Sequence, residues 1–264
     1  MKEEFNYTDE KFADLQMLRY RLDGFETLSL NQKLYIYYLS QATLCGRDIT
    51  TDQFCKYNLL IRRTLEAVYV NYEGCRDCDE FRAIILYLKR VWFSNGIHHH
   101  YGQDKFVPNF TEIYFRDVVR ATANVECEGV VSRMLPLCEG ESVDSLLKVL
   151  CPVIFDPKRL PKRVNQNEGE DLVATSACNY YNNLTQEEVE AYYNAIRDDS
   201  DPTPISYGLN STLCKTSDGE LREDVWHEGG RYGKAISHII HWLEKAAGVA
   251  ENAKQSEIIS LLVE

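Results

Sequence analysis

The chain has 264 residues, of which 44% are hydrophobic and 27% are charged. These values are typical of a globular protein that buries a sizeable core. The net charge of -12 argues against nucleic-acid binding, which depends on basic residues that neutralise phosphates. Because the sequence has no apolar stretch long enough to cross a bilayer and no apolar signal core at its N-terminus, we expect a cytoplasmic protein without a membrane partner.

The cysteines are nine in number, and most of them stand in apolar patterns, as Cys45, Cys151 and Cys178 do. Buried, reduced thiols are therefore expected. Cys75 and Cys78 have the Cys-x-x-Cys spacing just before a predicted helix, whose N-terminal dipole lowers the pKa of a thiol. No strand precedes them and no second pair follows. We interpret them as incidental surface thiols, with a redox role as the alternative.

Hydrophobic residues recur at helical spacing along most of the chain. Ser29 to Gln32 has the pattern of a capping box before a helix over residues 34–44, which Gly46 ends. Further helices are expected over residues 57–72, 79–93 and 143–149, from Thr111, from Thr185 to about Arg197, over residues 232–251, and in a short tail from Ser256.

Two regions depart from this helical pattern. Residues 155–166 contain two prolines and four basic residues, which predicts a loop. Residues 205–216 and 220–226 flank Ser217-Asp218-Gly219, the pattern of a β-hairpin with an Asp-Gly turn. We therefore expect an α+β fold, predominantly helical, with a possible boundary near residues 200–204 between a helical part and a hairpin-helix part.

The segment of residues 91–110 holds the densest set of chemically active side chains. A predicted helix ends at Asn95, three histidines follow at residues 98–100, and Pro108 closes the loop. Loops with many stacking, hydrogen-bonding and titrating groups commonly carry binding sites. Adjacent histidines cannot all face one ion, so we expect a polar loop that lines a cleft and no metal site.

Three other patterns invite a functional interpretation. His238 and His241 stand one helical turn apart, but zinc peptidases use His-Glu-x-x-His, so we interpret them as the polar edge of a packing helix. Residues 229–234 lack the Walker spacing and predict a joint between hairpin and helix. The basic residues at 158–163 beside Asp156 predict an ion-paired loop, with a carboxylate-binding patch as the alternative.

Several longer runs are distinctive. They are residues 91–110, Tyr38-Leu39-Ser40-Gln41-Ala42 with residues 45–48, Phe155-Asp156-Pro157 with residues 161–166, residues 205–211, and Trp242-Leu243-Glu244-Lys245-Ala246-Ala247. Together they resemble corresponding segments of the dipeptidyl peptidase III family, in particular its bacterial branch. These zinc enzymes remove dipeptides from the N-termini of peptides. The resemblance extends over nearly the whole chain.

The resemblance implies a place in a two-lobed peptidase. Residues 1–264 would form an N-terminal portion of its lower lobe, with helices around a small β-barrel to which the hairpin contributes. The loop after Asn95 would border the peptide cleft. By the same resemblance, Tyr101 and Phe106 would be apolar walls for the first substrate side chains, and Asn95 and Lys105 would shape the loop.

The family's zinc motifs, His-Glu-x-x-Gly-His and Glu-Glu-x-Arg/Lys-Ala-Asp, do not occur in this sequence. The resemblance therefore implies that zinc and the catalytic residues belong to a missing C-terminal portion of a longer enzyme, and that this chain binds no cofactor and is inert alone. Oligopeptides and that portion are the expected partners. The alternatives are a stand-alone, non-catalytic module that binds peptides or a protein, and a metalloenzyme built on His238 and His241.

Overall fold

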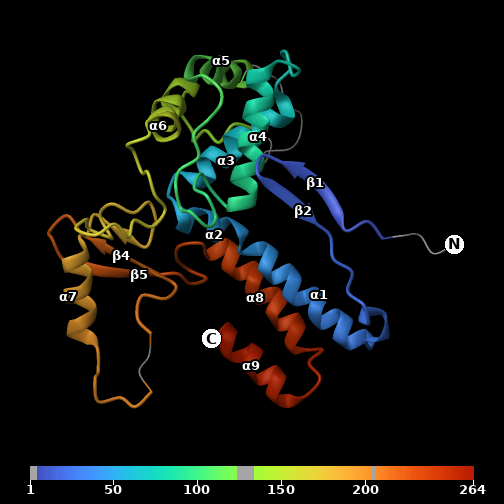
Figure 1. The fold of residues 1–264 in the computed structure, drawn as a ribbon. Coiled ribbons are helices and arrows are strands. Elements are labelled where there is room, and N and C mark those ends of the chain that lie inside the picture. The colour runs from blue at the N-terminus through green and yellow to red at the C-terminus, as the bar shows by residue number, and fades with distance from the viewer. Residues whose placement is uncertain (1–4, 124–133, 204–205) are drawn as a thin grey trace. The chain divides into compact units, whose positions relative to one another are not determined.

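The computed structural model describes residues 5–123, 134–203 and 206–264. Helices and short strands alternate irregularly along the chain, with more helix than strand (Figure 1). The expected α+β class is confirmed. In the described part of the chain, no helix is both long and apolar enough to cross a membrane.

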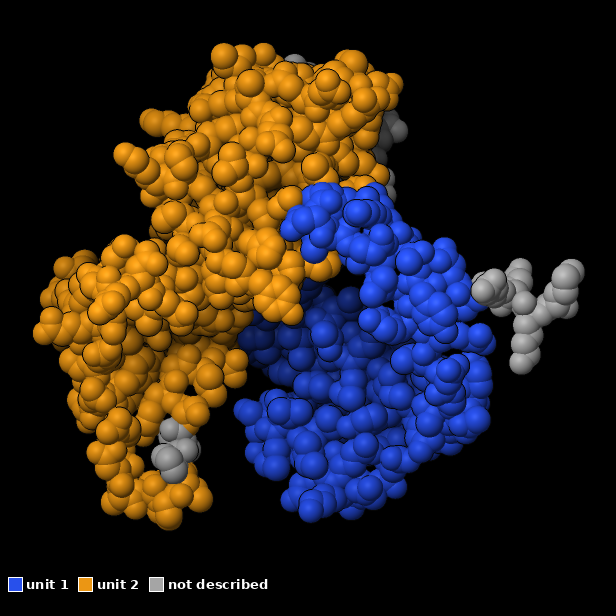
Figure 2. Space-filling model, viewed as in Figure 1, with its two compact units in different colours: residues 1–49, 227–264 blue, residues 50–226 orange. Residues whose placement is uncertain are grey.

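The chain divides into two compact units. The first comprises residues 1–49 and 227–264, and the second comprises residues 50–226 (Figure 2). The possible boundary near residues 200–204 falls inside the second unit, and residues 204–205 lie outside the described residues. The first unit therefore joins the two ends of the sequence, a division that local patterns did not indicate.

The first unit is built on two packed helices. Its elements are β1 (Thr8–Phe12), β2 (Leu15–Leu18), the 3-10 turn η1 (Phe25–Thr27), α1 (Leu30–Cys45), α8 (Gly233–Ala247) and α9 (Ala253–Val263). The predicted capping box is present, since Ser29 and Gln32 bond each other's main-chain amides at the start of α1. Tyr38 on α1 stacks on Trp242 of α8 with ring centroids 5.9 Å apart, so aromatic contact joins the two helices.

The second unit holds a helical part and a small sheet. Its elements are α2 (Arg47–Phe54, which begins before the division), α3 (Asn58–Asn71), α4 (Asp79–Ser94), α5 (Glu112–Ala123), α6 (Val143–Phe155), β3 (Tyr181–Asn182), α7 (Gln186–Ile196), β4 (Ser211–Lys215) and β5 (Leu221–Val225). Helix α3 packs against α4 and α5, and α5 packs against α6. Their fully buried side chains include Ile61, Leu88, Phe115 and Leu147, and burial of such apolar side chains stabilises this part.

The hairpin predicted from the Asp-Gly turn forms β4 and β5. The strands pair antiparallel from Ser211↔Val225 to Lys215↔Leu221, and Gly219 takes the positive φ of 91° that the turn requires. Strand β3 adds a short parallel pairing to β4. Leu213 of β4 packs with Val189 of α7 in a small separate cluster. The described strands form two open sheets and no closed barrel.

Most predicted helices are confirmed within a few residues, but three features differ. Helix α6 continues past Val149 to Phe155 with Pro152 inside it, although a proline there removes one amide from the helical hydrogen bonds. Helix α2 was not predicted, since its sequence is short and polar. The β1–β2 hairpin was not predicted either, because its strands are short and almost wholly exposed and no Asn-Gly or Asp-Gly pair lies between them.

Candidate functional site

The loop after α4 folds back on itself as a small hairpin, which we call the 97–106 loop. Phe106 donates its amide to the Ile97 oxygen at 2.9 Å, and His99 donates to the Asp104 oxygen at 2.8 Å. His98 and Lys105 form an antiparallel bridge between these bonds. The chain thus reverses direction at residues 100–103, which form the tip.

The first strand of the 97–106 loop is held by a hydrogen bond to the side chain of Asn58, at the start of α3. Asn58 is fully buried, and its side-chain oxygen accepts the Ile97 amide at 3.2 Å. Asn95 ends α4 in the left-handed conformation with a φ of 53°, as the Asn-Gly stop predicted. Gly96 follows, and a Cβ there would lie 2.1 Å from Asn58 Nδ2. The close approach of this backbone to Asn58 therefore requires glycine.

The second strand of the loop lies along the segment of residues 159–163. Lys105 donates its amide to the Pro161 oxygen at 2.9 Å, and Arg163 donates its amide to the Gln103 oxygen at 2.9 Å. Between these bonds Asp104 forms a bridge with Lys162, and their side chains pair at 3.2 Å. The predicted loop over residues 155–166 is confirmed, and its main chain supports the 97–106 loop.

His98 is the buried histidine of the run, with only 2% of its surface exposed. Its Nε2 lies 2.9 Å from the Leu160 carbonyl oxygen, so Nε2 carries the proton. Nδ1 is buried without a hydrogen-bond partner. Burial lowers the pKa of His98 to about 4, because the charged ring would lose its hydration. His98 is thus a neutral structural group at physiological pH.

Lys105 directs its ammonium at the end of α6. Its Nζ donates to the main-chain oxygens of Val153 at 3.0 Å and Arg159 at 2.6 Å, and also to that of Asp156. An ammonium has three donors, and each of them has a carbonyl partner here. Burial lowers the pKa of Lys105, against the opposing effect of the Asp156 carboxylate. The side chain joins the loop to α6 and presents no spare donor to a ligand.

The tip of the loop presents aromatic rings. His99 Nδ1 accepts the amides of Tyr101 at 3.2 Å and Gly102 at 2.9 Å, which closes the turn. The His99 and His100 rings stack with centroids 4.4 Å apart, and the Tyr101 ring lies 4.8 Å beyond His100. Tyr101 is 84% exposed. A rigidly supported turn therefore carries a solvent-facing phenol.

Phe106 lies in a different environment from Tyr101. It is 7% exposed and belongs to the core formed by α3 to α6, and the Arg90 guanidinium lies over its ring at 5.1 Å. The two residues that the resemblance assigns to one apolar wall thus face opposite ways, Tyr101 into solvent and Phe106 into the core. Phe106 supports the loop in this structure.

The basic residues of the 156–163 segment mostly contact aromatic groups. The Arg163 guanidinium lies 4.3 Å from the centre of the Phe54 ring, and Arg159 donates to the Tyr57 hydroxyl at 3.2 Å. Lys162 forms the segment's ion pair with Asp104. The prediction of an ion-paired loop thus applies to Lys162, whereas the two arginines make cation–π contacts that sequence did not indicate.

The His, Cys, Asp and Glu side chains that the structure describes do not gather into a metal site. Over residues 5–123, 134–203 and 206–264, no group of three or more His, Cys, Asp or Glu side chains is arranged to hold a metal ion. His238 and His241 are exposed on α8, where the His241 ring lies edge-on to Trp242. The histidines at 98–100 are divided between the core and the tip. The donor set described here does not fit a zinc site.

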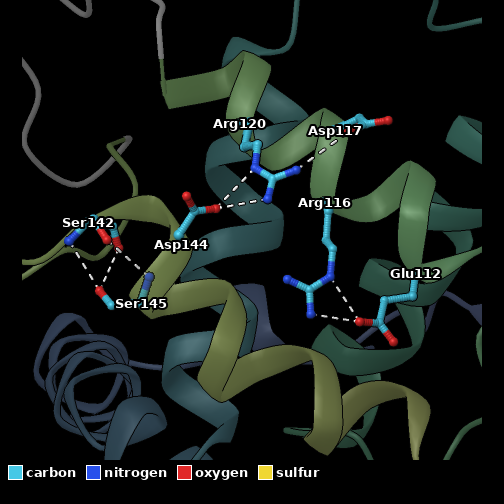
Figure 3. Close-up of polar contacts among 7 residues, drawn as sticks. All are labelled: Glu112, Arg116, Asp117, Arg120, Ser142, Asp144 and Ser145. Atoms are coloured by element: carbon cyan, nitrogen blue, oxygen red, sulfur yellow. Dashed lines mark hydrogen bonds and ion pairs between the residues drawn. The ribbon is translucent and has the colours of Figure 1, made fainter.

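Charged residues also concentrate between α5 and α6 (Figure 3). Arg116 bonds Glu112 at 2.7 Å, four residues earlier on α5. Arg120 pairs with Asp117 at 3.7 Å and with Asp144 of α6 at 2.9 Å. Arg116 and Arg120 each have a carboxylate partner, so neither is an unneutralised cation for a ligand, and such exposed pairs add little to stability.

The sequence did not indicate several residues that position the loop. In the sequence, Asn58 has the pattern of an ordinary residue near the start of a helix, and Leu160 that of an ordinary loop residue. Leu160 has a φ of 51°, which is unusual for a residue with a side chain. The one sequence feature that could have indicated its role is a hydrophobic residue within a basic loop.

A scan of the sequence against models of known protein families finds no match.

Proposed function

We propose that this chain is part of a zinc-dependent dipeptidyl peptidase of the dipeptidyl peptidase III type, and that its 97–106 loop supplies part of one wall of the peptide cleft. The proposal rests on the sequence runs that resemble that family. The observation that carries it furthest is the exposed Tyr101 ring, at the tip of a loop whose His98 and Lys105 side chains are anchored to residues outside it.

A peptide-binding wall needs an aromatic ring that faces solvent and a backbone that is rigidly held. Asn58, His98 and Lys105 hold both strands of the loop to buried or helical structure. Rigid support lowers the entropy lost on binding. The Tyr101 ring offers an apolar face and a hydroxyl, which suits contact with peptide side chains and main chain. Val107, 78% exposed just beyond the loop, extends the apolar surface.

The metal belongs elsewhere in this proposal. Bound zinc activates water and polarises a scissile carbonyl, and the described residues do not offer it a site. By the resemblance, we assign zinc and the catalytic groups to further sequence of a longer enzyme, and propose that the hairpin joins its barrel there. This chain would position the peptide and would not hydrolyse it alone.

Peptide binding tests the role of the loop. A fluorescent tetrapeptide is titrated with the purified chain and with the Y101A and Y20A variants, and anisotropy is measured. Tyr20 is also highly exposed, at 78%, but lies outside the loop. We expect Y101A to weaken binding about fivefold, the effect of losing roughly 1 kcal/mol of ring contact, and Y20A to have no effect. Equal affinities for all three would contradict the assigned wall.

A hydrolysis assay tests whether this chain alone has peptidase activity. The chain is assayed with a diarginyl arylamide and added zinc, and no arylamine release is expected. Zinc-dependent release that survives repurification and is lost in H241A would instead support a metalloenzyme on α8. The reading frame after Glu264 separates the remaining options. Continuation into a His-Glu-x-x-Gly-His motif supports the peptidase, and a stop codon supports the non-catalytic binding module.

A further inference from the structure

Cys75 and Cys78 lie in the connection between α3 and α4, in contact with a second helix. Cys78 is the N-cap of α4, with extended φ and ψ of -77° and 156°, and is partly buried, while Cys75 is exposed. The Cys78 thiol donates to the Cys75 carbonyl oxygen at 3.5 Å. The backbone thus bends between the two cysteines, directly before a helix N-terminus.

The Cys78 sulfur has a specific polar neighbour. The Tyr114 hydroxyl, from the first turn of α5, lies 3.0 Å from it. This hydroxyl is the largest cause that lowers the pKa of Cys78, ahead of the Phe81 amide and the Cys75 side chain. Burial, and then the contact with Cys78, raises the pKa of Tyr114. The phenol therefore stays protonated and donates to a thiolate at Cys78.

Two side chains, those of Glu80 and Arg76, hold this arrangement in place. Glu80, in the first turn of α4, accepts both the amide and the hydroxyl of Thr111 at 3.0 and 2.7 Å, which joins the N-termini of α4 and α5. Arg76, between the two cysteines, donates to the Tyr69 oxygen at 2.7 Å and the Tyr72 oxygen at 3.1 Å. The turn is thereby tied to the end of α3, and Tyr114 is held over Cys78.

Three other thiols, at Cys55, Cys151 and Cys178, lie in the opposite environment. Burial raises the pKa of Cys55 and of Cys151 to about 11, and it raises that of Cys178. Such thiols stay protonated and unreactive. Cys78 combines a thiolate-stabilising hydroxyl with a second cysteine three residues away, a combination that serves redox exchange.

We propose that Cys75 and Cys78 form a reversible redox site that closes to an intramolecular disulfide, with Cys78 as the attacking thiolate, Tyr114 as its positioning residue, and small disulfides of the glutathione type as oxidant. This inference is independent of the proposed peptidase function. It assigns a role to a pair that has the redox spacing but that its sequence context, with no predicted strand before it, indicated to be incidental surface thiols.

The exchange proceeds in two steps. The Cys78 thiolate attacks one sulfur of oxidised glutathione, the S–S bond of glutathione breaks, and one glutathione thiolate leaves with the electron pair. Cys75 then gives its proton to solvent and attacks the Cys78 sulfur of the mixed disulfide, which releases the second glutathione thiolate. Two protein thiols are oxidised to one disulfide, and one glutathione disulfide is reduced to two thiols.

A redox titration tests the proposal. The protein is equilibrated with reduced and oxidised glutathione, alkylated and mapped by peptide mass spectrometry. We expect a disulfide-linked peptide containing Cys75 and Cys78, a glutathione adduct on Cys78 in the C75S variant, and an unchanged pair in the C138S control, since Cys138 is exposed and lies elsewhere. If both thiols stay alkylatable at every glutathione ratio, the proposal is overturned.

The pH dependence of alkylation tests the role of Tyr114. In the unmodified protein, Cys78 is expected to react with iodoacetamide at lower pH than Cys138 does, a comparison that needs no variant. In Y114F, checked for folding by circular dichroism, the Cys78 rate at about pH 7 is expected to fall roughly threefold or more. Identical pH profiles for Cys78 and Cys138 would contradict an activated thiolate.

Discussion

The hydrogen bond of 2.9 Å between His98 Nε2 and the Leu160 carbonyl oxygen determines the state of a buried ring. Since a carbonyl oxygen only accepts, Nε2 carries the proton, and Nδ1 is left as a buried acceptor without a partner. The contact also joins the 97–106 loop to the segment after α6. The titratable residue His98 therefore joins two segments of the second unit, and its protonation is expected to change the free energy of unfolding.

The first prediction concerns acid stability. The pKa of His98 is about 4 in the native chain because of burial, against about 6.5 in an unfolded chain. Between these values the unfolded state binds more protons, so stability falls as pH falls from about 7 toward 4. From pH 7 to pH 5 the unmodified chain should lose about 2 kcal/mol more than H98Q. Urea denaturation at both pH values measures this.

The control for His98 is the exposed His241 on α8. H241Q should keep the pH dependence of the unmodified chain. If H98Q and the unmodified chain lose the same free energy of unfolding between pH 7 and pH 5, His98 titrates normally and is not the buried neutral group described here.

The second prediction concerns the lysine ammonium beneath the loop. K105M removes its charge-assisted hydrogen bonds to the oxygens of Val153, Asp156 and Arg159, and leaves the end of α6 without these partners. The free energy of unfolding should fall by roughly 2–3 kcal/mol. K148M, at an exposed position of α6, should change it by less than about 0.5 kcal/mol. Equal stabilities of K105M and K148M would rule out this role for Lys105.

The third prediction concerns Gly96. A methyl group at Gly96 would lie 2.1 Å from Asn58 Nδ2, at a φ of 154°. Because Asn58 is fixed by bonds to Thr51 and Ile97, G96A should cost roughly 2–4 kcal/mol of stability. Gly169 also has a positive φ but open space around it, so G169A measures backbone strain alone, about 1 kcal/mol.

A double-mutant cycle isolates the Gly96 clash. N58A removes the group that the new methyl would strike, so G96A should cost at least about 1 kcal/mol less in the N58A background. Additive effects of G96A and N58A would mean that the two residues do not meet in solution.

The fourth prediction compares two kinds of polar contact at α6 (Figure 3). Ser142 caps the helix through the Ser145 amide at 3.1 Å, so S142A should lower stability by about 1 kcal/mol. Arg120 pairs with Asp144 at 2.9 Å, but the two side chains are 49% and 74% exposed. R120A should therefore change stability by less than about 0.5 kcal/mol. Thermal unfolding that ranks R120A below S142A would contradict this order.

Local patterns were sufficient for most elements of the fold. The capping residues Ser29 and Thr185 and the Asp-Gly turn act within a few residues along the chain, so the sequence indicates their effects. Apolar periodicity likewise identified the helices that make up the core of the second unit. The same patterns identified Asn95 as the end of α4, because a left-handed cap depends on one residue's own backbone preference.

Other features depend on contacts between distant residues. Asn58 supports Ile97, Lys105 reaches Arg159, and Tyr114 meets Cys78 across 36 positions. Nothing in the local sequence of either partner specifies the other, since such contacts form only when helices pack. The sequence by itself determined most of the helices, the Asp-Gly hairpin turn and the composition of the loop. Only the tertiary structure decided that Phe106 is buried while Tyr101 is exposed, and that one of two neighbouring cysteines lies against a phenol.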